Sequence, residues 1–260
     1  MKSFIKKYTK TLLFFAIIGL IGGFFLGLYM LDSYPEEIKS ELALEIEKLG
    51  VGEISPDIFL GILTAVQSLG YGVILGAVGI FVAKKVGLWK DEITISKKPL
   101  IITAAAGAIG GLVLILPDIL LFSKYSGAVA ASYAAKPTVA YILASVTYGA
   151  VIEEVMLRLF AMSLAALLIN RLILKRKDEP TDKVFIAANI VSALLFALGH
   201  LPTTFILLGN SPLLIIRCLI LNGGFGLLFG YLYRKYGLRY AMIAHGGVHI
   251  VAKLIWLIFI

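Results

Sequence analysis

The sequence is poor in charged residues, cysteine and histidine. Only 15% of its 260 residues are charged, 60% are hydrophobic, and the mean hydropathy is +0.95. A soluble globule needs more polar residues than this to cover its surface, whereas a helix bundle in lipid can be apolar outside as well as inside. The composition therefore excludes an ordinary soluble domain and predicts a single integral membrane domain, residues 1–260.

The single cysteine and the net positive charge also bear on the chemistry of the chain. Its one cysteine, Cys218, excludes an intrachain disulfide. Because Cys218 lies in an apolar run, we expect a buried small hydrophobe there and not a reactive thiolate. The net charge is +8, but the basic residues are spread over loops without interleaved aromatic residues. That pattern is typical of the cytoplasmic loops of membrane proteins, so no nucleic-acid partner is expected.

Apolar runs long enough to cross about 30 Å of hydrocarbon recur along the chain. They cover residues 11–31, 58–83, 100–122, 138–172, 184–209, 212–232 and 241–260. The fourth would be near 50 Å long as one straight helix, so it must tilt, protrude or break. The pattern predicts an all-α, polytopic transmembrane helix bundle of about seven to eight helices, with N-terminal spans in 11–134 and a C-terminal group in 138–260.

The loops predict how the chain is oriented. Lysines and arginines precede the first run and fill the loops after the second, fourth and sixth runs, and such loops are normally cytoplasmic. We therefore expect a multi-pass protein of the cell membrane, embedded in the lipid bilayer, with a cytoplasmic N-terminus.

The segment between the first two runs is acidic and is predicted to lie on the opposite, external side. Pro35 and Gly50 bound a stretch with apolar residues at helical spacing, so an amphipathic surface helix is expected over 35–50. The acidic residues of the segment are Asp32, Glu36, Glu37, Glu41, Glu45, Glu47, Glu53 and Asp57.

A few ionisable residues remain inside the apolar runs after the loop charges are set aside. Such a group in hydrocarbon costs several kcal/mol, so it normally faces the bundle interior and marks function. For Asp118, Arg217 and Lys253 we expect structural roles, with Lys253 snorkelling toward the membrane surface. The remaining residues are Glu153, Glu154, Arg158, His200, His245 and His249.

The adjacent glutamates have different expected roles. On a helix, Glu154 and Arg158 are four residues apart and lie on one face, whereas Glu153 points about 100° away. Arg158 should therefore neutralise Glu154 in a buried ion pair that supports the site. Glu153 is predicted to be the free carboxylate, available as a general base.

The three histidines share the same apolar setting. In the sequence FALGH, Phe196 and His200 lie on one helical face, and in AMIAHGGVH, His245 and His249 are one turn apart with two glycines between them. The glycines leave room for a ligand near the backbone. Packing alone does not readily explain three histidines and a glutamate pair on three apolar helices, so they are predicted to form a functional site.

The motifs EEVMLR, FALGH and HGGVH occur in the order typical of the CAAX-protease and bacteriocin-processing (CPBP) family, and the chain resembles that family from about Thr138 to its end. The resemblance implies an intramembrane glutamate-dependent endopeptidase, related to enzymes that remove the last three residues of prenylated CAAX proteins. It implies that Glu153 and His200 activate water and that no cofactor is required. His245 and the polar residue one turn later would stabilise the oxyanion, with Glu154 and Arg158 in support.

One residue departs from the family pattern. His249 stands where Asn or Asp is usual, and a neutral histidine still donates one N–H.

The expected substrate is a membrane-associated peptide or lipidated protein, either a prenylated tail or a bacteriocin or peptide precursor.

Two alternatives remain open. His200, His245, His249 and Glu153 would suit a zinc ion, although the H-E-x-x-H motif is absent. A non-catalytic membrane scaffold or transporter could instead use the histidines as a proton relay.

The depths of the site residues pose a geometric problem. Counted from the basic loops, His245 lies about 9 Å deep, whereas Glu153 and His200 lie about 25–27 Å deep. They are level only if the fourth and fifth helices extend beyond the membrane or if Pro202 bends the fifth.

Overall fold

The computed structural model describes residues 2–50, 54–91 and 95–260, and every element in these ranges is a helix. Glu53, one of the acidic residues predicted to be external, lies outside them. Six described helices are long and apolar enough to cross a membrane: Lys6–Ser33, Pro56–Lys85, Lys97–Tyr125, Asp182–Leu207, Pro212–Tyr236 and Leu238–Phe259. The prediction of an all-α polytopic bundle is confirmed, and the protein is a multi-pass membrane protein.

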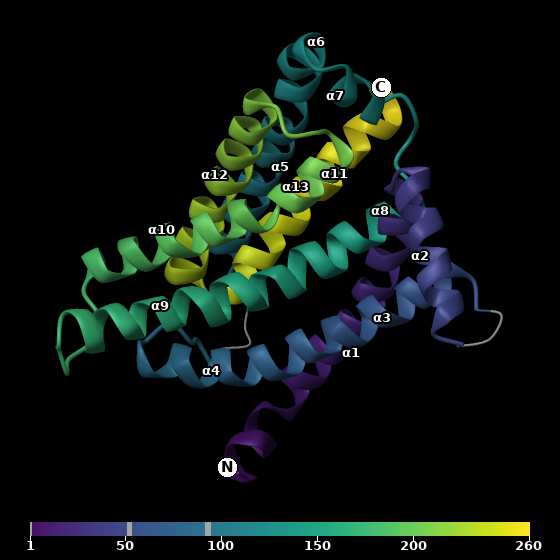
Figure 1. Ribbon diagram of the computed structural model, residues 1–260. Helices are drawn as coiled ribbons and strands as arrows, with labels where there is room; N and C mark the ends of the chain where they lie inside the picture. Colours follow the sequence, from purple (N-terminus) through teal and green to yellow (C-terminus); the bar gives the residue numbers. More distant parts are fainter. Residues whose placement is uncertain (1, 51–53, 92–94) are drawn as a thin grey trace.

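The N-terminal part of the chain contributes to two places in the bundle: its first helices lie along one side, and its last long helix lies beside the C-terminal helices (Figure 1). Its elements are α1 (Lys2–Ser33), α2 (Glu36–Lys48), α3 (Pro56–Gly70), the π-helix η1 (Tyr71–Leu75), α4 (Gly76–Lys85), α5 (Lys97–Pro117), the π-helix η2 (Asp118–Phe122), α6 (Ser123–Tyr125) and α7 (Gly127–Ser132). Helix α2 is the predicted amphipathic helix, and Gly50 follows it with a φ of 63°.

The C-terminal part contains all the predicted site residues. Its elements are α8 (Val139–Ala144), η3 (Ser145–Glu153), η4 (Val155–Met162), α9 (Ser163–Leu168), η5 (Ile169–Ile173), α10 (Asp182–Gly199), α11 (Leu201–Leu207), α12 (Pro212–Tyr236) and α13 (Leu238–Phe259).

The predicted fourth span is a continuous helical run from α8 to η5, and it carries the glutamate pair. The regular α-helix expected there is interrupted, because η3 and η4 are π-helical on either side of Glu154. Hydrogen bonds from i to i+5 widen such turns, which occur often at functional sites. The Ser163 hydroxyl donates to the carbonyl of Arg158, five residues earlier, at 3.4 Å.

The oblique course of this run explains how Glu153 and His245 can meet although they lie at different depths when counted from the basic loops. In Figure 1 the run crosses α13 obliquely, and its basic end continues well past the start of α13. Glu153 and His245 therefore meet although they are at different distances along their own helices from the basic end. Within the fifth span, Asp182–Leu207, the regular helix is interrupted at His200, between the end of α10 at Gly199 and the start of α11 at Leu201.

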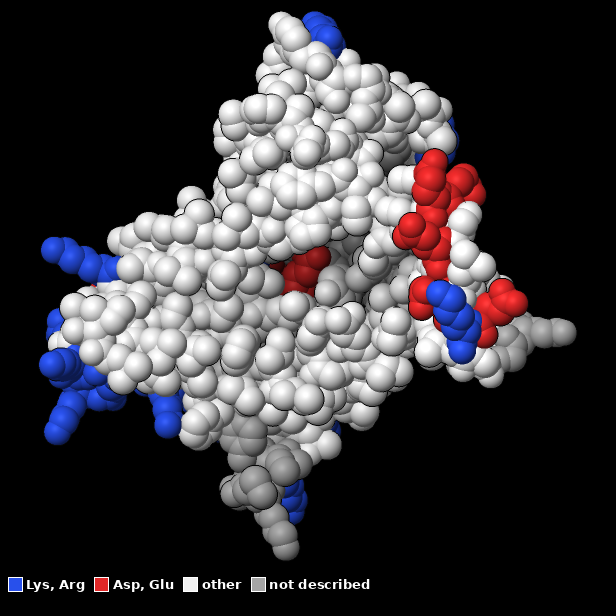
Figure 2. Space-filling model, viewed as in Figure 1, with Lys and Arg blue, Asp and Glu red and all other residues white. Residues whose placement is uncertain are grey.

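Side-chain contacts place the basic loops at one end of the bundle. Lys7 Nζ lies 2.9 Å from Asp91 Oδ2, and Lys90 Nζ donates to the carbonyl of Lys235 at 2.6 Å. The hydrogen bonds from Lys7 and from the Trp89 indole hold the pKa of Asp91 below its ordinary value. Figure 2 shows lysine and arginine gathered at one end and acidic residues over α2 at the other. These contacts bring the N-terminal segment, the loop after α4 and the end of α12 close together.

Close packing against α5 fixes the position of α13, the helix that carries His245 and His249. Helix α13 packs along α5, and a Cβ atom on Gly107 would lie 2.9 Å from the carbonyl oxygen of Ala244 and 3.0 Å from Gly247 Cα. Small residues permit this approach of two transmembrane backbones. The Gly247 side of α13 is thus held against α5, while α13 also packs against η3, which carries Glu153.

Candidate active site

The two adjacent glutamates have different environments. Glu154 and Arg158 are both fully buried, and Arg158 Nε lies 3.4 Å from Glu154 Oε2, as the four-residue spacing predicted. The Glu153 side chain keeps 20% of its surface exposed. Figure 2 shows acidic atoms at the bottom of a hollow in an otherwise uncharged face. Of the two carboxylates, Glu153 is therefore the one that a substrate or water can reach.

Arg158 is held by contacts from two other helices. Its guanidinium lies over the rings of Phe196 at 4.6 Å and Phe229 at 5.5 Å, and its Nη2 donates to the carbonyl of Gly226 at 3.3 Å. Cation–π contacts gain strength when they are removed from water. Arg158 thus connects α10 and α12 to the buried carboxylate of Glu154.

We expect Arg158→Met to lower the free energy of unfolding by about 3–5 kcal/mol, because it leaves the Glu154 carboxylate buried without its cation. Thermal unfolding in detergent measures the change. The matched control is Arg176→Met, since Arg176 pairs with Asp178 at the exposed basic end and should matter little. Equal stability of the two variants would contradict a structural role for the Glu154–Arg158 pair.

His245 lies between the two glutamates. Its Nδ1 is 2.9 Å from Glu154 Oε1, its Nε2 is 3.9 Å from Glu153 Oε2, and its ring stacks on Phe229 at 4.5 Å. An ionised carboxylate only accepts hydrogen bonds, so Nδ1 carries a proton and donates to Glu154. In the neutral ring, Nε2 then presents its lone pair on the side of Glu153. Sequence reasoning missed the contact with Glu154, because the two residues are 91 positions apart.

His249 lies one turn beyond His245, and Gly149 keeps the space beside both rings open. The two imidazole centroids are 5.0 Å apart. A Cβ atom on Gly149 would lie 3.4 Å from His249 Nε2 and 3.9 Å from His245 Nε2. Both Nε2 atoms therefore border one small space, one turn before Glu153. Sequence reasoning did not identify Gly149, although its four-residue spacing from Glu153 was a usable signal.

Phe196 joins His200 to this group. The Phe196 ring contacts the imidazoles of His200 at 4.6 Å and His245 at 5.9 Å between centroids. His200 Nδ1 lies 2.8 Å from the carbonyl oxygen of Phe196. A carbonyl accepts only, so Nδ1 donates and Nε2 of the neutral ring is free to accept a proton. The Phe196 ring thus lies between His200 and His245, and His245 is the histidine that contacts both glutamates.

Two observations bear on the zinc alternative. Among the described residues, no three His, Cys, Asp or Glu side chains are grouped closely enough to hold a metal ion. His245 uses Nδ1 for Glu154, and Lys253 Nζ lies 3.5 Å from His249 Nδ1.

The other charged residues of the apolar runs divide into two cases. Asp118 and Arg217 form an ion pair with each other, and the Tyr133 hydroxyl donates to Asp118 at 2.8 Å, in keeping with structural roles. The expected snorkelling of Lys253 is wrong. Its surface is only 4% exposed, because the side chain turns inward, where its Nζ lies over the Tyr141 ring at 4.0 Å.

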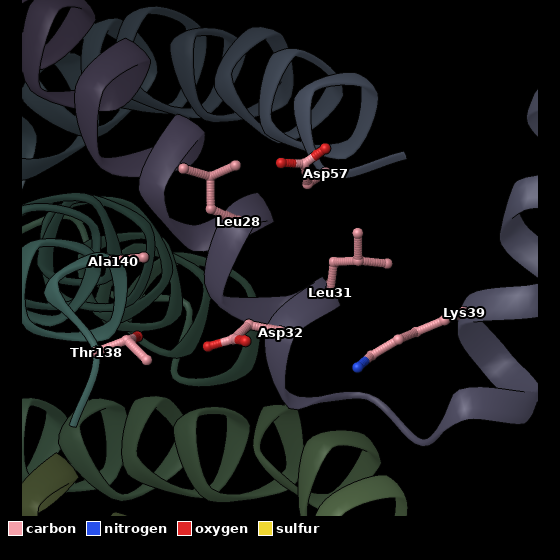
Figure 3. Close-up of a pocket in the computed structure, with 7 residues that line it drawn as sticks. All are labelled: Leu28, Leu31, Asp32, Lys39, Asp57, Thr138 and Ala140. Carbon is pink, nitrogen blue, oxygen red and sulfur yellow. The ribbon is translucent and has the colours of Figure 1, made fainter. Parts of the chain in front are cut away.

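A separate pocket of about 380 Å³ lies at the acidic end of the molecule (Figure 3). Thr138, which lines this pocket, lies at the start of the helical run that carries Glu153. At a rise of about 1.5 Å per residue, the two residues are roughly 20 Å apart along that run. The pocket contains none of the predicted site residues. It is lined by Leu28, Leu31, Asp32, Lys39, Asp57, Thr138 and Ala140.

Comparison with known families gives one match that covers the whole candidate site. Residues 135–251 match the family model described as type II CAAX prenyl endopeptidase Rce1-like. This range is a little under half of the chain and includes the glutamate pair and all three histidines. No curated protein and no solved structure matches the chain. Residues 135–251 are therefore similar to the Rce1-like type II CAAX prenyl endopeptidases, and the protein is a membrane-embedded peptidase.

Proposed function

We propose that the protein is a glutamate-dependent intramembrane endopeptidase in which Glu153 and His200 activate water and His245 and His249 stabilise the oxyanion. The observation that carries the proposal is the asymmetry of the glutamate pair. Glu154 is buried behind His245 and Arg158, whereas Glu153 is partly exposed and close to His245 Nε2. One carboxylate thus orients the site, and the other is free to exchange protons with water.

The first step is the attack of water on the scissile carbonyl. Glu153 and the free Nε2 of His200 accept hydrogen bonds from the water, and Glu153 takes one of its protons as the new C–O bond forms. The carbonyl π electrons move onto oxygen and give a tetrahedral oxyanion. No covalent enzyme intermediate is needed, because the nucleophile is water itself.

The second step is the collapse of this intermediate. His249 can donate from Nε2 to the oxyanion. His245 can donate from Nε2 after Glu153 has passed to that nitrogen the proton it took from water. Glu154 would stabilise the resulting imidazolium, as a carboxylate does in a Ser-His-Asp triad. The proton then passes to the leaving amine, the C–N bond breaks, and the carboxyl product forms.

The setting favours a membrane-associated substrate. The candidate site lies among apolar helices, so the cleaved segment must enter from the membrane, as would a prenylated CAAX-type tail or a bacteriocin or peptide precursor. The concentration of lysine and arginine at one end supports a cell-membrane protein with that end, and its N-terminus, in the cytoplasm.

Cleavage of synthetic peptides by the purified protein tests the function. We expect it to hydrolyse a farnesylated CAAX peptide or a membrane-bound precursor peptide better than a soluble peptide of the same sequence, and to keep its rate in a strong chelator. Metal analysis of the same sample should show well below one zinc per chain. Loss of activity in chelator with recovery on adding zinc would establish the zinc mechanism instead. Failure to cleave any of the peptides would favour a non-catalytic role.

A further inference from the structure

His249 poses a problem that an asparagine at this position would not have. An asparagine amide always carries N–H donors, whereas a neutral imidazole has one N–H that can reside on either nitrogen. Only the form with the proton on Nε2 can donate into the space beside Gly149, because Nε2 is the atom that borders it. Some neighbouring group must therefore select that form if His249 is to act as a constant donor.

Lys253 lies on the other side of the same ring. It follows His249 by one turn on α13, and its Nζ is 3.5 Å from His249 Nδ1. As an ammonium group, Lys253 has three donors and no acceptor, and its contact with Nδ1 then requires the lone pair on that nitrogen. The matched family range ends at residue 251, before Lys253.

The burial of Lys253 has a defined structural support. The Nζ atom lies 4.0 Å above the centroid of the Tyr141 ring, in the geometry of a cation–π contact. Tyr141 is itself stacked on Tyr29 at 4.3 Å and contacts Trp256 edge-on at 6.1 Å. These aromatic rings hold the ammonium inside the bundle, close to His249, although a lysine near a helix end would ordinarily extend toward water.

We propose that Lys253 is a positioning residue that donates to His249 Nδ1 and thereby confines the imidazole proton to Nε2. The proton then points into the space that His245 Nε2 also borders. The lysine and histidine together act as the fixed N–H donor that a single amide would supply. This inference rests on the proposed oxyanion role of His249, but its effect on the ring tautomer exists without any reaction.

The tautomer can be measured directly by nitrogen-15 NMR of histidine-labelled protein. The chain has only three histidines, so variants that lack one histidine at a time assign each signal. We expect His249 in the wild type to show a protonated Nε2 and a bare Nδ1. In Lys253→Met the proton should redistribute between the two nitrogens, and in Lys253→Arg, which keeps a donor, it should not.

A wild-type spectrum with the His249 proton on Nδ1 would overturn the inference even if no variant folds. So would a Lys253→Met spectrum with an unchanged tautomer. Neither result depends on activity, so the tautomer test is separate from the test of the proposed function.

Kinetics supply a second, independent test through coupling between the two residues. Lys253→Met should lower kcat by about 10–10²-fold and leave KM nearly unchanged, because a donor to the oxyanion is weakened and not replaced. In a His249→Asn background the same change should cost less than about twofold, since an amide donor has no tautomer to select. An equal loss in both backgrounds would show that Lys253 serves only the packing of the bundle.

Discussion

Replacement of Glu153 by glutamine should lower kcat by about 10²–10⁴-fold, the range expected when a general base is lost. Glutamine has nearly the same shape and can still hydrogen-bond to water, but its amide cannot take a proton. Because the Glu153 side chain is partly exposed and Glu154 forms the buried ion pair, the variant should fold as the wild type does. Initial rates with a purified, membrane-bound peptide substrate measure the loss.

The neighbouring glutamate provides the matched comparison. Glu154→Gln removes the negative charge from a fully buried pair with Arg158, so it should reduce thermal stability as well as activity. Glu153→Gln should reduce activity alone. If Glu153→Gln retained near-normal kcat, the assignment of the base would be wrong, whatever the behaviour of Glu154.

Removal of the His245 ring should be almost as damaging. We expect His245→Ala to lower kcat by about 10²–10³-fold, the usual cost of losing one oxyanion donor. His245 also receives contacts from both glutamates, so the variant leaves Glu154 without the donor at 2.9 Å. The loss should appear in kcat more than in KM, because the oxyanion exists only after water has attacked.

His249→Asn is the control for this second experiment. It changes an adjacent ring of the same cluster but keeps an N–H donor at the position. We expect it to retain activity within about tenfold of the wild type, since no donor is lost. His245→Ala with substantially more activity than His249→Asn would reverse the two roles and contradict the mechanism.

Local spacing was enough to predict much of the bundle and part of the site. Six of the seven apolar runs coincide with helices long and apolar enough to cross a membrane, and the four-residue spacing of Glu154 and Arg158 gave their ion pair. These features depend on neighbours within one or two helical turns, where helix geometry fixes which side chains meet. The motifs also identified His245, which contacts both glutamates, and the two histidines that ring contacts link to it.

The contacts between distant helices were not predictable in the same way. The hydrogen bond from His245 to Glu154 depends on the slant at which α13 crosses the fourth span, and hydrophobic periodicity does not specify crossing angles. The inward turn of Lys253 depends on Tyr141, which lies on a different helix. The π-helical turns around Glu154 have no signal in the apolar pattern, because that pattern does not distinguish a wider turn from an ordinary one.

The most direct test of the central claim compares membrane peptides in cells that contain either the wild type or Glu153→Gln at equal abundance. Quantitative mass spectrometry would identify peptides and lipidated protein tails that differ between the two. We predict that at least one uncleaved membrane-associated precursor accumulates with Glu153→Gln and that its shortened product appears only with the wild type. Identical peptide profiles would contradict the conclusion that Glu153 is the base of an intramembrane endopeptidase.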